Sequence, residues 1–293
     1  MEILALDVGG TFVKAGRFRS GELVYFEEFP TQAEQGAVHM VDRICDYICQ
    51  KSPDRVGIST TGIADPVSGS VVFATDAMPG YSGFHLGEYV RQKTGVPVAV
   101  ENDANCAAVG EAFCGAARGL TDFLCVTYGT GIGGGVYIGG KLFTGYRGLT
   151  TEIGHIVTHA GGAQCSCGQR GCYEMYASTN ALVRRAAELG LARNGREICA
   201  RRNEPEIAAV LDAWCDEVVA GLVSLTRTYN PQAIILGGGI MTRCDLVAEL
   251  RRRFSSQIMP AFYPTQLIPA ALGNQAGVYG AFVLAQRQAD RGE

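Results

Sequence analysis

The stretch that decides the fold is ILALDVGGTFVK, residues 3–14. Its apolar start predicts a strand over 3–6, its glycines predict a tight turn over 7–11, and its end opens a second strand over 12–18. Backbone N–H groups at such a turn can reach a phosphate, because glycine places no side chain in the way. Lys14 adds a cation, and Asp7 could hold Mg²⁺ directly or through water. The stretch therefore predicts a phosphate-binding hairpin.

Two further glycine turns follow apolar strands. A strand over 123–128 leads into a turn over 129–135 and a returning strand over 136–138. A buried strand over 233–236 leads into Gly237-Gly238-Gly239 and a helix, where a nucleoside could lie against bare backbone. A single glycine turn often binds nothing, but three in one chain, each after a buried strand, favour a binding function.

Two other kinds of phosphate-binding loop do not fit. The chain has no G-x-x-x-x-G-K-[ST] motif, so it is not expected to be a P-loop enzyme. Residues 129–134 match G-x-G-x-x-G formally, but in a dinucleotide-binding fold that turn must open a helix. Here the following residues 135–140, GVYIGG, predict a strand and a turn.

The rest of the chain mixes strands with long helices, which is typical of an α/β protein. Further strands are predicted at 23–26, 56–59 and 96–100. Helices are predicted at 35–50, 102–114, 179–229 with breaks near 190–195 and at Pro205, 242–257 and 275–289. A loop is expected from about 60 to 83, and an irregular stretch over 144–178. The 293 residues predict about two domains, 1–118 and 119–274, with the C-terminal helix over 275–293 packing back on the first.

Composition excludes several classes of protein. The 25 lysines and arginines and the 29 acids leave a net charge of −4, which argues against nucleic-acid binding. Hydrophobic residues make up 47% of the chain, so a sizeable core is expected. No apolar run reaches the roughly 18–20 residues that span a bilayer, and the start has no secretory signal pattern. We therefore expect a cytoplasmic enzyme that binds neither membrane nor nucleic acid.

A cluster of cysteines with one histidine predicts a metal site. His155, Cys165, Cys167 and Cys172 form the pattern H-x9-C-x-C-x4-C. One nitrogen and three sulfurs suit tetrahedral zinc with no position left for water, so the metal should be structural. The alternative is a chance bunching of buried cysteines. A disulfide between Cys165 and Cys167 is disfavoured by strain and by a reducing compartment.

Several acids are candidates for chemistry. Glu101-Asn102-Asp103 follows a strand and opens a helix, where Asp103 would stay ionised. The alternative is that Asn102 or Asp103 only caps the helix. Glu152 and Glu174 flank the cysteine–histidine cluster and could bind sugar hydroxyls, or they could be solvated surface acids.

Taken together and in order, these motifs resemble the ROK family of repressors and sugar kinases over essentially the whole chain. The motifs are D-x-GGT-x-x-K from Asp7, Asn102-Asp103, GTG-x-GGG over 129–135, E-I-G-H over 152–155, and C-x-CG-x-x-GC-Y-E over 165–174. The resemblance implies the actin-like ATPase fold of the sugar kinases, with two α/β domains, a central cleft and a zinc-binding loop.

The resemblance also implies roles for particular residues. Asp103 would be the general base. The ATP contacts would be Asp7, Gly9, Gly10, Thr11, Lys14, Thr130, Gly131, Gly133, Gly134, Gly237, Gly238 and Gly239. The sugar contacts would be Asn102, Asp103, Glu152, His155 and Glu174, with Gly62 and Thr75 in a loop that covers the sugar in N-acetylmannosamine kinases. His155, Cys165, Cys167 and Cys172 would hold structural Zn²⁺.

The activity so implied is ATP- and Mg²⁺-dependent phosphorylation of a hexose hydroxyl, in particular the 6-hydroxyl. Glucose, N-acetylmannosamine or a β-glucoside would be the substrate, and residues 78–83 resemble the β-glucoside kinases. Family members are often dimers or tetramers, so a homo-oligomer is expected. The alternative is a non-catalytic sugar-binding regulator. Family repressors carry an N-terminal helix-turn-helix, whereas this sequence opens on the first phosphate strand, so DNA binding is not expected. A third alternative is a chaperone or filament ATPase of the actin class. Those proteins lack the zinc loop, so residues 165–172 argue against this alternative.

Overall fold

The computed structural model describes residues 1–293 except 76, 147, 150, 244–245 and 291–293. The chain forms two compact units. The first comprises Met1–Arg118, Leu142–Thr150 and Asn274–Glu293, and the second comprises Gly119–Lys141 and Thr151–Gly273. The segment 142–150 thus groups with the first unit, although it lies inside the range expected for the second domain.

The first unit is built on a five-stranded sheet. Its strand order is β3-β2-β1-β4-β7, with bounds β1 Glu2–Val8, β2 Phe12–Arg19, β3 Glu22–Pro30, β4 Arg55–Thr60 and β7 Val98–Asn102. The first hairpin pairs β1 with β2 antiparallel and sets Asp7 opposite Lys14. Strands β4 and β7 then extend the sheet in parallel with β1, so that the carboxyl ends of all three meet at one edge.

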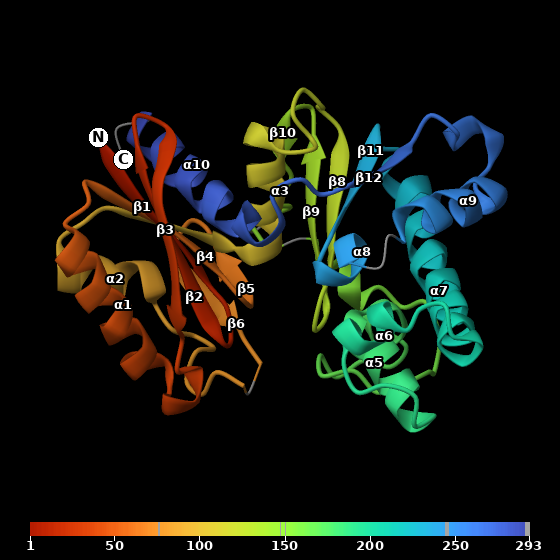
Figure 1. The fold of residues 1–293 in the computed structure, drawn as a ribbon. Coiled ribbons are helices and arrows are strands. Elements are labelled where there is room, and N and C mark those ends of the chain that lie inside the picture. Colours follow the sequence, from red (N-terminus) through yellow and green to blue (C-terminus); the bar gives the residue numbers. More distant parts are fainter. Residues whose placement is uncertain (76, 147, 150, 244–245, 291–293) are drawn as a thin grey trace. The chain divides into compact units, whose positions relative to one another are not determined.

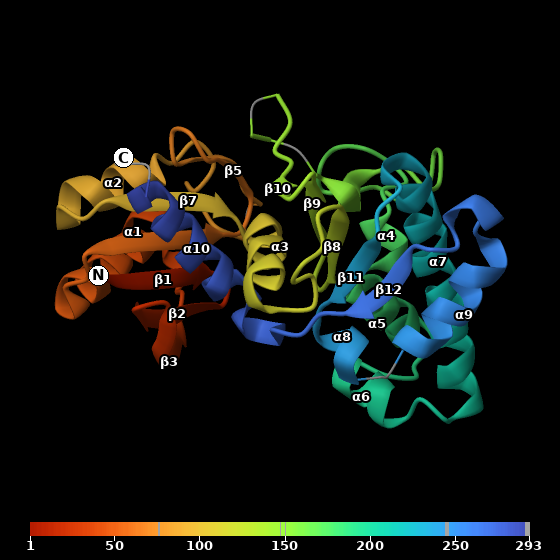
Figure 2. The ribbon, with the colours of Figure 1, turned by 90° about the horizontal axis from the view of Figure 1, so that it is seen from above.

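Helices cover both faces of this sheet (Figures 1 and 2). Successive side chains of β1 point to opposite faces of the sheet, and both faces are buried. Leu4, Leu6 and Val8 pack in one core with α1 (Ala37–Lys51) and α2 (Leu86–Thr94). Ile3 and Ala5 are also buried, and α10 (Ala276–Asp290) contacts β1, β4 and α3 (Asp103–Cys114).

Glycines let α10 approach its neighbours at backbone distance. A Cβ at Gly57 would lie 2.0 Å from the carbonyl oxygen of Ala281, and one at Gly280 would lie 1.9 Å from that of Cys106. A methyl group fits at neither place, so both contacts require glycine. These contacts fix α10 against β4 and α3, and Figure 1 shows α3 and α10 side by side.

The second unit repeats the plan of an antiparallel hairpin followed by parallel strands. Its strand order is β10-β9-β8-β11-β12, with bounds β8 Phe123–Tyr128, β9 Ile132–Ile138, β10 Lys141–Leu142, β11 Ala233–Gly237 and β12 Gln266–Pro269. Strands β8 and β9 pair antiparallel, whereas β11 runs parallel to both β8 and β12.

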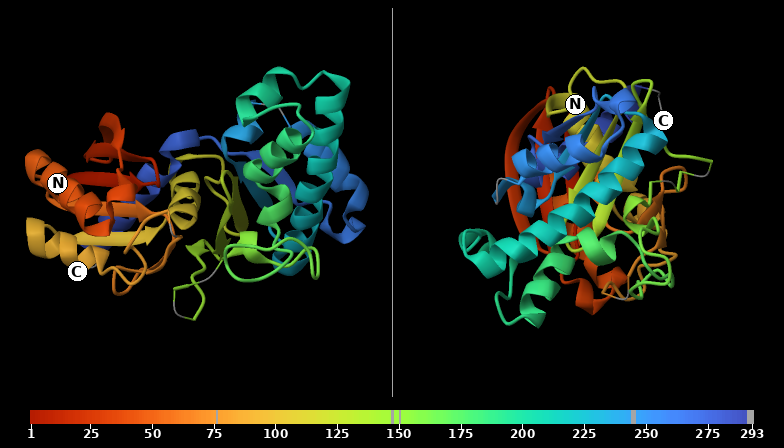
Figure 3. Two further views of the ribbon diagram at one scale, coloured as in Figure 1. Left: turned by 90° about the horizontal axis from the view of Figure 1, so that it is seen from below. Right: turned by 90° about the vertical axis from the view of Figure 1, so that its right-hand side faces the viewer.

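Six helices described in the second unit complete its core. They are α4 Glu174–Ala177, α5 Thr179–Glu188, α6 Gly195–Ala200, α7 Pro205–Tyr229, α8 Gly239–Arg243 and α9 Val247–Gln257. The long helix α7, teal in Figure 3, buries Trp214, whose indole N–H donates to the carbonyl of Ser178. This bond ties α7 to the residue that caps α5.

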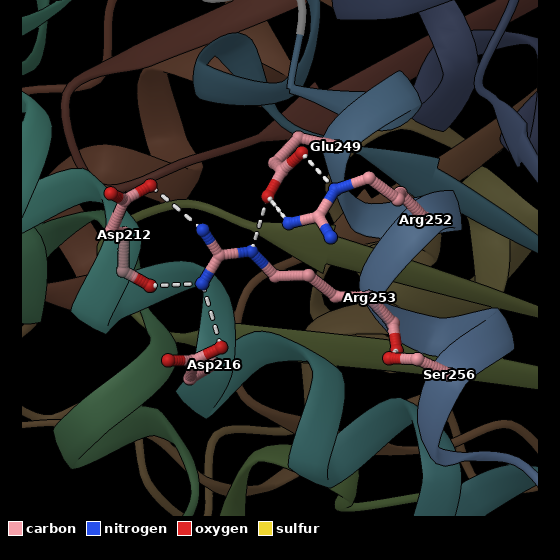
Figure 4. A network of polar contacts seen from close by, with 6 residues as sticks. All are labelled: Asp212, Asp216, Glu249, Arg252, Arg253 and Ser256. Atoms are coloured by element: carbon pink, nitrogen blue, oxygen red, sulfur yellow. Dashed lines mark hydrogen bonds and ion pairs between the residues drawn. The ribbon is translucent and has the colours of Figure 1, made fainter.

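An arginine joins α9 to α7 at the surface of the second unit (Figure 4). The guanidinium of Arg253 pairs with Glu249 at 2.6 Å and with Asp212 and Asp216 at 2.7 Å each. Its side chain is only 13% exposed, so these charge-assisted bonds are shielded from water better than an ordinary surface pair. The network is structural, because each nitrogen of the guanidinium already has a protein partner.

The predicted strands and helices are present, but several elements were not predicted and some bounds differ. The loop over 60–83 contains a two-stranded hairpin, β5 (Ile63–Asp65) with β6 (Ser70–Phe73), and α2, α4, β10 and β12 were not predicted. The glycine turn over 129–135 is shorter than predicted, because β9 already begins at Ile132. The helix predicted over 242–257 is split into α8 and α9, and its residues 244–245 lie outside the described ones.

Single-turn 3-10 helices complete the described structure, at Ala33–Gln35, Ile153–His155, Pro260–Phe262 and Gly273–Gln275. Among the residues described, no helix combines the length and apolar character that a membrane crossing requires.

The close approach of α10 makes a testable prediction. Gly280→Ala places a methyl 1.9 Å from the Cys106 carbonyl oxygen, so the helices must separate. We expect the free energy of unfolding to fall by about 1–3 kcal/mol in chemical denaturation, despite the better helix propensity of alanine. Arg287→Ala, at an exposed position of the same helix, is the control and should change it by less than about 0.5 kcal/mol. Equal stability of Gly280→Ala and wild type would contradict the contact.

Candidate functional site

Asp7, at the end of β1, is held by side chains from the two neighbouring strands. The ammonium of Lys14 lies 2.8 Å from Oδ2 of Asp7, and the hydroxyl of Ser59 donates to Oδ1 at 2.7 Å. A Cβ at Gly277, in α10, would lie 2.7 Å from the carboxylate carbon. Ser59 and Gly277 were not predicted from the sequence. The parallel register of β1 and β4 pairs Ser59 with Asp7, a contact that the sequence alone does not show.

The turn after Asp7 has an open side. A hydrogen bond from the N–H of Gly9 to the carbonyl of Phe12 closes the turn at 3.1 Å, and Thr31 supports it from β3's end, donating to the carbonyls of Gly9 and Thr11. A Cβ at Gly10 would meet nothing within 4 Å. Gly10 and Thr11 are both exposed. The space beside Gly10 is therefore open, and it is there that the prediction places a phosphate.

The residues predicted to contact ATP in the second hairpin fall into two groups, one in the turn and one in the strand β9. Thr130 and Gly131 lie in the turn, which the N–H of Gly129 closes by donating to the carbonyl of Gly131 at 3.0 Å. Gly133 and Gly134 lie within β9. A Cβ at Gly134 would come within 2.2 Å of the side chain of Ile153, so this glycine serves the packing of the neighbouring 3-10 helix.

The third turn borders a pocket that also reaches the second hairpin. Gly237 ends β11, Gly238 has a φ of +97° and lies against the Tyr128 carbonyl, and Gly239 begins α8. The pocket has a volume of about 580 Å³ and is lined by Tyr128, Gly129, Thr130, Thr179, Asn180, Asn194, Gly195, Arg196, Gly239 and Ile240. Of the predicted contacts, Thr130 and Gly239 line it, whereas the segments 179–180 and 194–196 were not foreseen.

The cysteine–histidine cluster has the geometry of a tetrahedral metal site. Ligand atoms of His155, Cys165, Cys167 and Cys172 all lie within 4.8 Å of one another. The sulfurs of Cys167 and Cys172 are 3.6 Å apart, and Nδ1 of His155 is 3.6 Å from the sulfur of Cys165. A tetrahedron with zinc–sulfur bonds of about 2.3 Å has edges of about 3.8 Å. The three thiols are free, and the donor set therefore fits zinc.

Gly171 lets the cysteine loop fold back on itself. Its φ is +85°, and a Cβ there would lie 1.7 Å from the carbonyl oxygen of His159. A second support comes from Tyr176, whose ring stacks on His159 at 3.9 Å and whose hydroxyl accepts from the N–H of Ala163 at 2.7 Å. The loop is thus braced by side chains other than its candidate metal ligands.

Glu174 contacts both the cluster and the second hairpin. Its Oε1 accepts from the thiol of Cys165 at 3.3 Å, and its Oε2 accepts weakly from the N–H of Ile132 at 3.4 Å. A Cβ at Gly131 would come within 2.5 Å of the same Oε2. Glu174 is 17% exposed, so it is not a solvated surface acid.

Glu152 faces the other nitrogen of the histidine ring. Its Oε2 lies 3.7 Å from Nε2 of His155, and its side chain is 45% exposed. Desolvation raises the pKa of the Glu152 carboxyl; the neighbouring charge of Glu174 adds to this effect and His155 opposes it. The histidine therefore has Nδ1 on the side of the cysteines and Nε2 on the side of a carboxylate, at a distance longer than a hydrogen bond.

In the first unit, Asn102 and Asp103 hold different positions at the start of α3. Asn102 caps α3 by accepting from the N–H groups of Ala104 and Asn105, and its amide donates to the carbonyl of Gly62 at 2.9 Å and to Oδ1 of Asp103 at 3.0 Å. The capping alternative thus applies to Asn102, whereas Asp103 is the first residue of the helix.

Glu101 supports this corner from below. Its Oε1 accepts from the N–H of Asn102 at 2.9 Å and from the side-chain amide of Asn105 at 3.0 Å. Burial raises the pKa of the Glu101 carboxyl. Gly62 has a φ of +87° and lies against the Phe73 carbonyl, whereas Thr75 is exposed in the same loop. Gly62 is thus joined to Asn102 by a hydrogen bond.

The two α/β units, the open glycine turns and the cysteine–histidine loop fit the actin-like fold of the sugar kinases. The ROK family profile matches residues 3–288, and the chain belongs to the ROK family, as the sequence predicted.

Several named relatives of this chain are sugar kinases. A glucokinase from Halalkalibacterium halodurans is 31% identical over 97% of this chain and 95% of its own length. A β-glucoside kinase from Listeria innocua is 31% identical over 96% of each. A ROK glucokinase from Streptomyces griseus, solved with glucose and AMPPNP, matches with a TM-score of 0.86 and 35% identity, covering 98% of this chain and 100% of that one.

The cluster predicts one tightly bound zinc per chain. Elemental analysis of the purified protein should find it, and Cys167→Ser should lose it, because three ligands seldom form a closed structural site. Cys114→Ser, which changes an exposed free cysteine outside the cluster, should keep the metal. A wild-type protein without metal, or a Cys167→Ser variant with a full complement, would contradict the assignment.

Proposed function

We propose that this chain is an ATP-dependent sugar kinase (EC 2.7.1.-). It transfers the γ-phosphoryl group of ATP to a hydroxyl of a hexose or hexose derivative, in particular the 6-hydroxyl. The observation that carries the proposal is the orientation of the Asp103 carboxylate at the start of α3. Asn102 and the N–H of Ala104 hold its Oδ1, so the carboxylate is oriented, as a general base must be.

Phosphoryl transfer requires mainly positioning and neutralisation of charge. The N–H groups of the open turns, at Gly10 and Thr11 and at Thr130 and Gly131, would bind phosphate oxygens. Gly9 would shape the first turn, because its own N–H donates to the carbonyl of Phe12. Lys14 supplies the cation. Asp7 would hold Mg²⁺, directly or through water, and the ion would neutralise phosphate charge. Gly237, Gly238 and Gly239 would border the adenosine, with Gly239 in the wall of the pocket.

Sugar hydroxyls would be bound by carboxylates and by the histidine. Glu152 and Glu174 are acceptors on either side of His155, and Asp103 takes the proton of the attacking hydroxyl. Asn102 positions Asp103 and Gly62 by hydrogen bonds, and Thr75 belongs to the same loop as Gly62. Bound Zn²⁺ would supply no reactive water and would hold the loop that carries these acids.

The relatives' names favour glucose or a β-glucoside as substrate, and N-acetylmannosamine is a further candidate. The likeness of residues 78–83 to β-glucoside kinases supports the β-glucoside among these candidates. Within that stretch Tyr81 is fully buried, with its hydroxyl 2.7 Å from that of Thr60. We further propose a cytoplasmic homo-oligomer, a dimer or a tetramer.

A sugar-binding regulator is the second candidate. A xylose repressor from Bacillus spizizenii is 32% identical over 82% of this chain, which spans 64% of that protein. A regulator of this kind has no need of a general base, so turnover separates the two functions.

A coupled assay with ATP, Mg²⁺ and a panel of glucose, N-acetylmannosamine, N-acetylglucosamine, fructose and a β-glucoside tests the proposal. At least one sugar should be phosphorylated, and Asp103→Asn should lower kcat about 10²- to 10⁴-fold with little change in sugar affinity. Asp46→Asn, at an exposed position of α1, is the control. Turnover of Asp103→Asn at the wild-type rate would remove Asp103 from the mechanism, and no turnover of any sugar would favour the regulator.

The two hairpins allow a matched comparison. Gly10→Val places its side chain in open space, where the phosphate is proposed to lie, so ATP binding should be lost while sugar affinity and the nucleotide-free Tm stay unchanged. In Gly131→Val the Cβ would also strike Glu174 at 2.5 Å, so sugar affinity should fall as well. Calorimetric titration of each ligand measures both effects. Unchanged nucleotide affinity in Gly10→Val would rule out the first turn as a phosphate site.

A further inference from the structure

The pocket of the second unit has a wall that the glycine turns do not supply. Asn180 comes from the start of α5, and Asn194, Gly195 and Arg196 come from the start of α6. They line the same volume of about 580 Å³ as Gly129, Thr130 and Gly239. The turns offer backbone groups, whereas this wall adds the side chains of Asn180, Asn194 and Arg196.

Some polar groups of this wall are already engaged. The hydroxyl of Thr179 donates to the carbonyl of Tyr128 at 3.0 Å. Oδ1 of Asn194 caps α6 by accepting from the N–H of Glu197 at 2.9 Å. The side chains of Asn180 and Arg196 differ: neither has a hydrogen-bond or ion-pair partner among the residues that the structure describes.

The charge of the pocket is also unbalanced. Its lining contains one arginine and no acid. The nearest acid in the sequence, Glu197, has other partners, because Oε1 pairs with Arg201 at 3.1 Å and Oε2 accepts from the N–H of Arg193 at 2.9 Å. Arg196 is therefore a cation without a counter-charge from the lining, beside an amide with unused donors and acceptors.

We infer that Arg196 and Asn180 recognise the base of the nucleotide donor. The inference rests on the proposed kinase function and deepens it. A guanidinium is attracted to the face of an aromatic ring, and a carboxamide can pair with the amino group and ring nitrogen of adenine in a bidentate manner. Arg196 lies over the base and Asn180 hydrogen-bonds to its edge. The wall thus selects a nucleoside triphosphate over inorganic polyphosphate, and adenine over guanine.

Calorimetric titration of the sugar-free protein with ADP, GDP and inorganic tripolyphosphate tests this assignment. Arg196→Ala should weaken ADP and GDP about 2- to 30-fold, the usual range for one cation–π contact, and should leave tripolyphosphate unchanged. Asn180→Ala should lower the preference for ADP over GDP by about 5-fold or more. Both positions are exposed, so the nucleotide-free Tm should stay at the wild-type value.

Arg193→Ala is the matched control. Arg193 carries the same charge as Arg196 and lies three residues before it, but it does not line the pocket. It should bind all three ligands as the wild type does. Wild-type ADP affinity in Arg196→Ala would overturn the inference while the kinase function stands. Equal losses in Arg193→Ala, or an equal loss for tripolyphosphate, would reduce Arg196 to a general electrostatic role and would also overturn it. A wild-type protein that binds no ADP and phosphorylates no sugar would remove the proposed function itself.

Discussion

The candidate site of the second unit depends on the convergence of four side chains. Between Glu152 and Glu174 the chain has one single-turn 3-10 helix, Ile153–His155, and two isolated bridges. Turn and bridge hydrogen bonds, such as those from Thr158 to Gly171 and from Gly171 to Ala163, shape part of this stretch. The meeting of His155, Cys165, Cys167 and Cys172 within 4.8 Å adds a further constraint. Three sulfurs so close are stable together when a cation draws them inward, so the places of both flanking acids follow from the cluster.

Glu174 extends this constraint to the second hairpin. One oxygen of its carboxylate contacts Cys165 and the other faces the N–H of Ile132, and Gly131 must lack a side chain to let it approach. The loop that carries Glu152 and Glu174 and the turn that borders the pocket are therefore in contact through this carboxylate. A change at the cluster should reach the hairpin through this carboxylate and through the packing of Ile153 against Gly134, although the cluster and the hairpin lie far apart in the sequence.

The sequence predicted the elements that repeat a simple pattern and failed where tertiary packing decides. Strands such as β1 and β8 are apolar runs bounded by turn residues, and the cysteine spacing is specific enough to predict a metal site. The hairpin of β5 and β6 escaped prediction because Pro66 and Gly69 make its short strands resemble a loop. Ser59 and Gly277 escaped because their importance lies in contact with Asp7, and a single sequence shows no contacts.

Glycine explains why part of the site was predicted and part was not. Gly10 leaves space open, Gly238 adopts a positive φ, and Gly134 admits a neighbouring side chain. In the sequence all three are simply glycines in a glycine-rich turn, and nothing distinguishes them. A run of glycines therefore indicates that the backbone is special without showing which of these purposes applies. The partner side chains settle it: open solvent at Gly10, the Tyr128 carbonyl at Gly238 and Ile153 at Gly134. By the same argument the wall formed by Asn180 and Arg196 could emerge only from the structure, since neither residue belongs to a glycine turn and the starts of two helices bring them to one pocket.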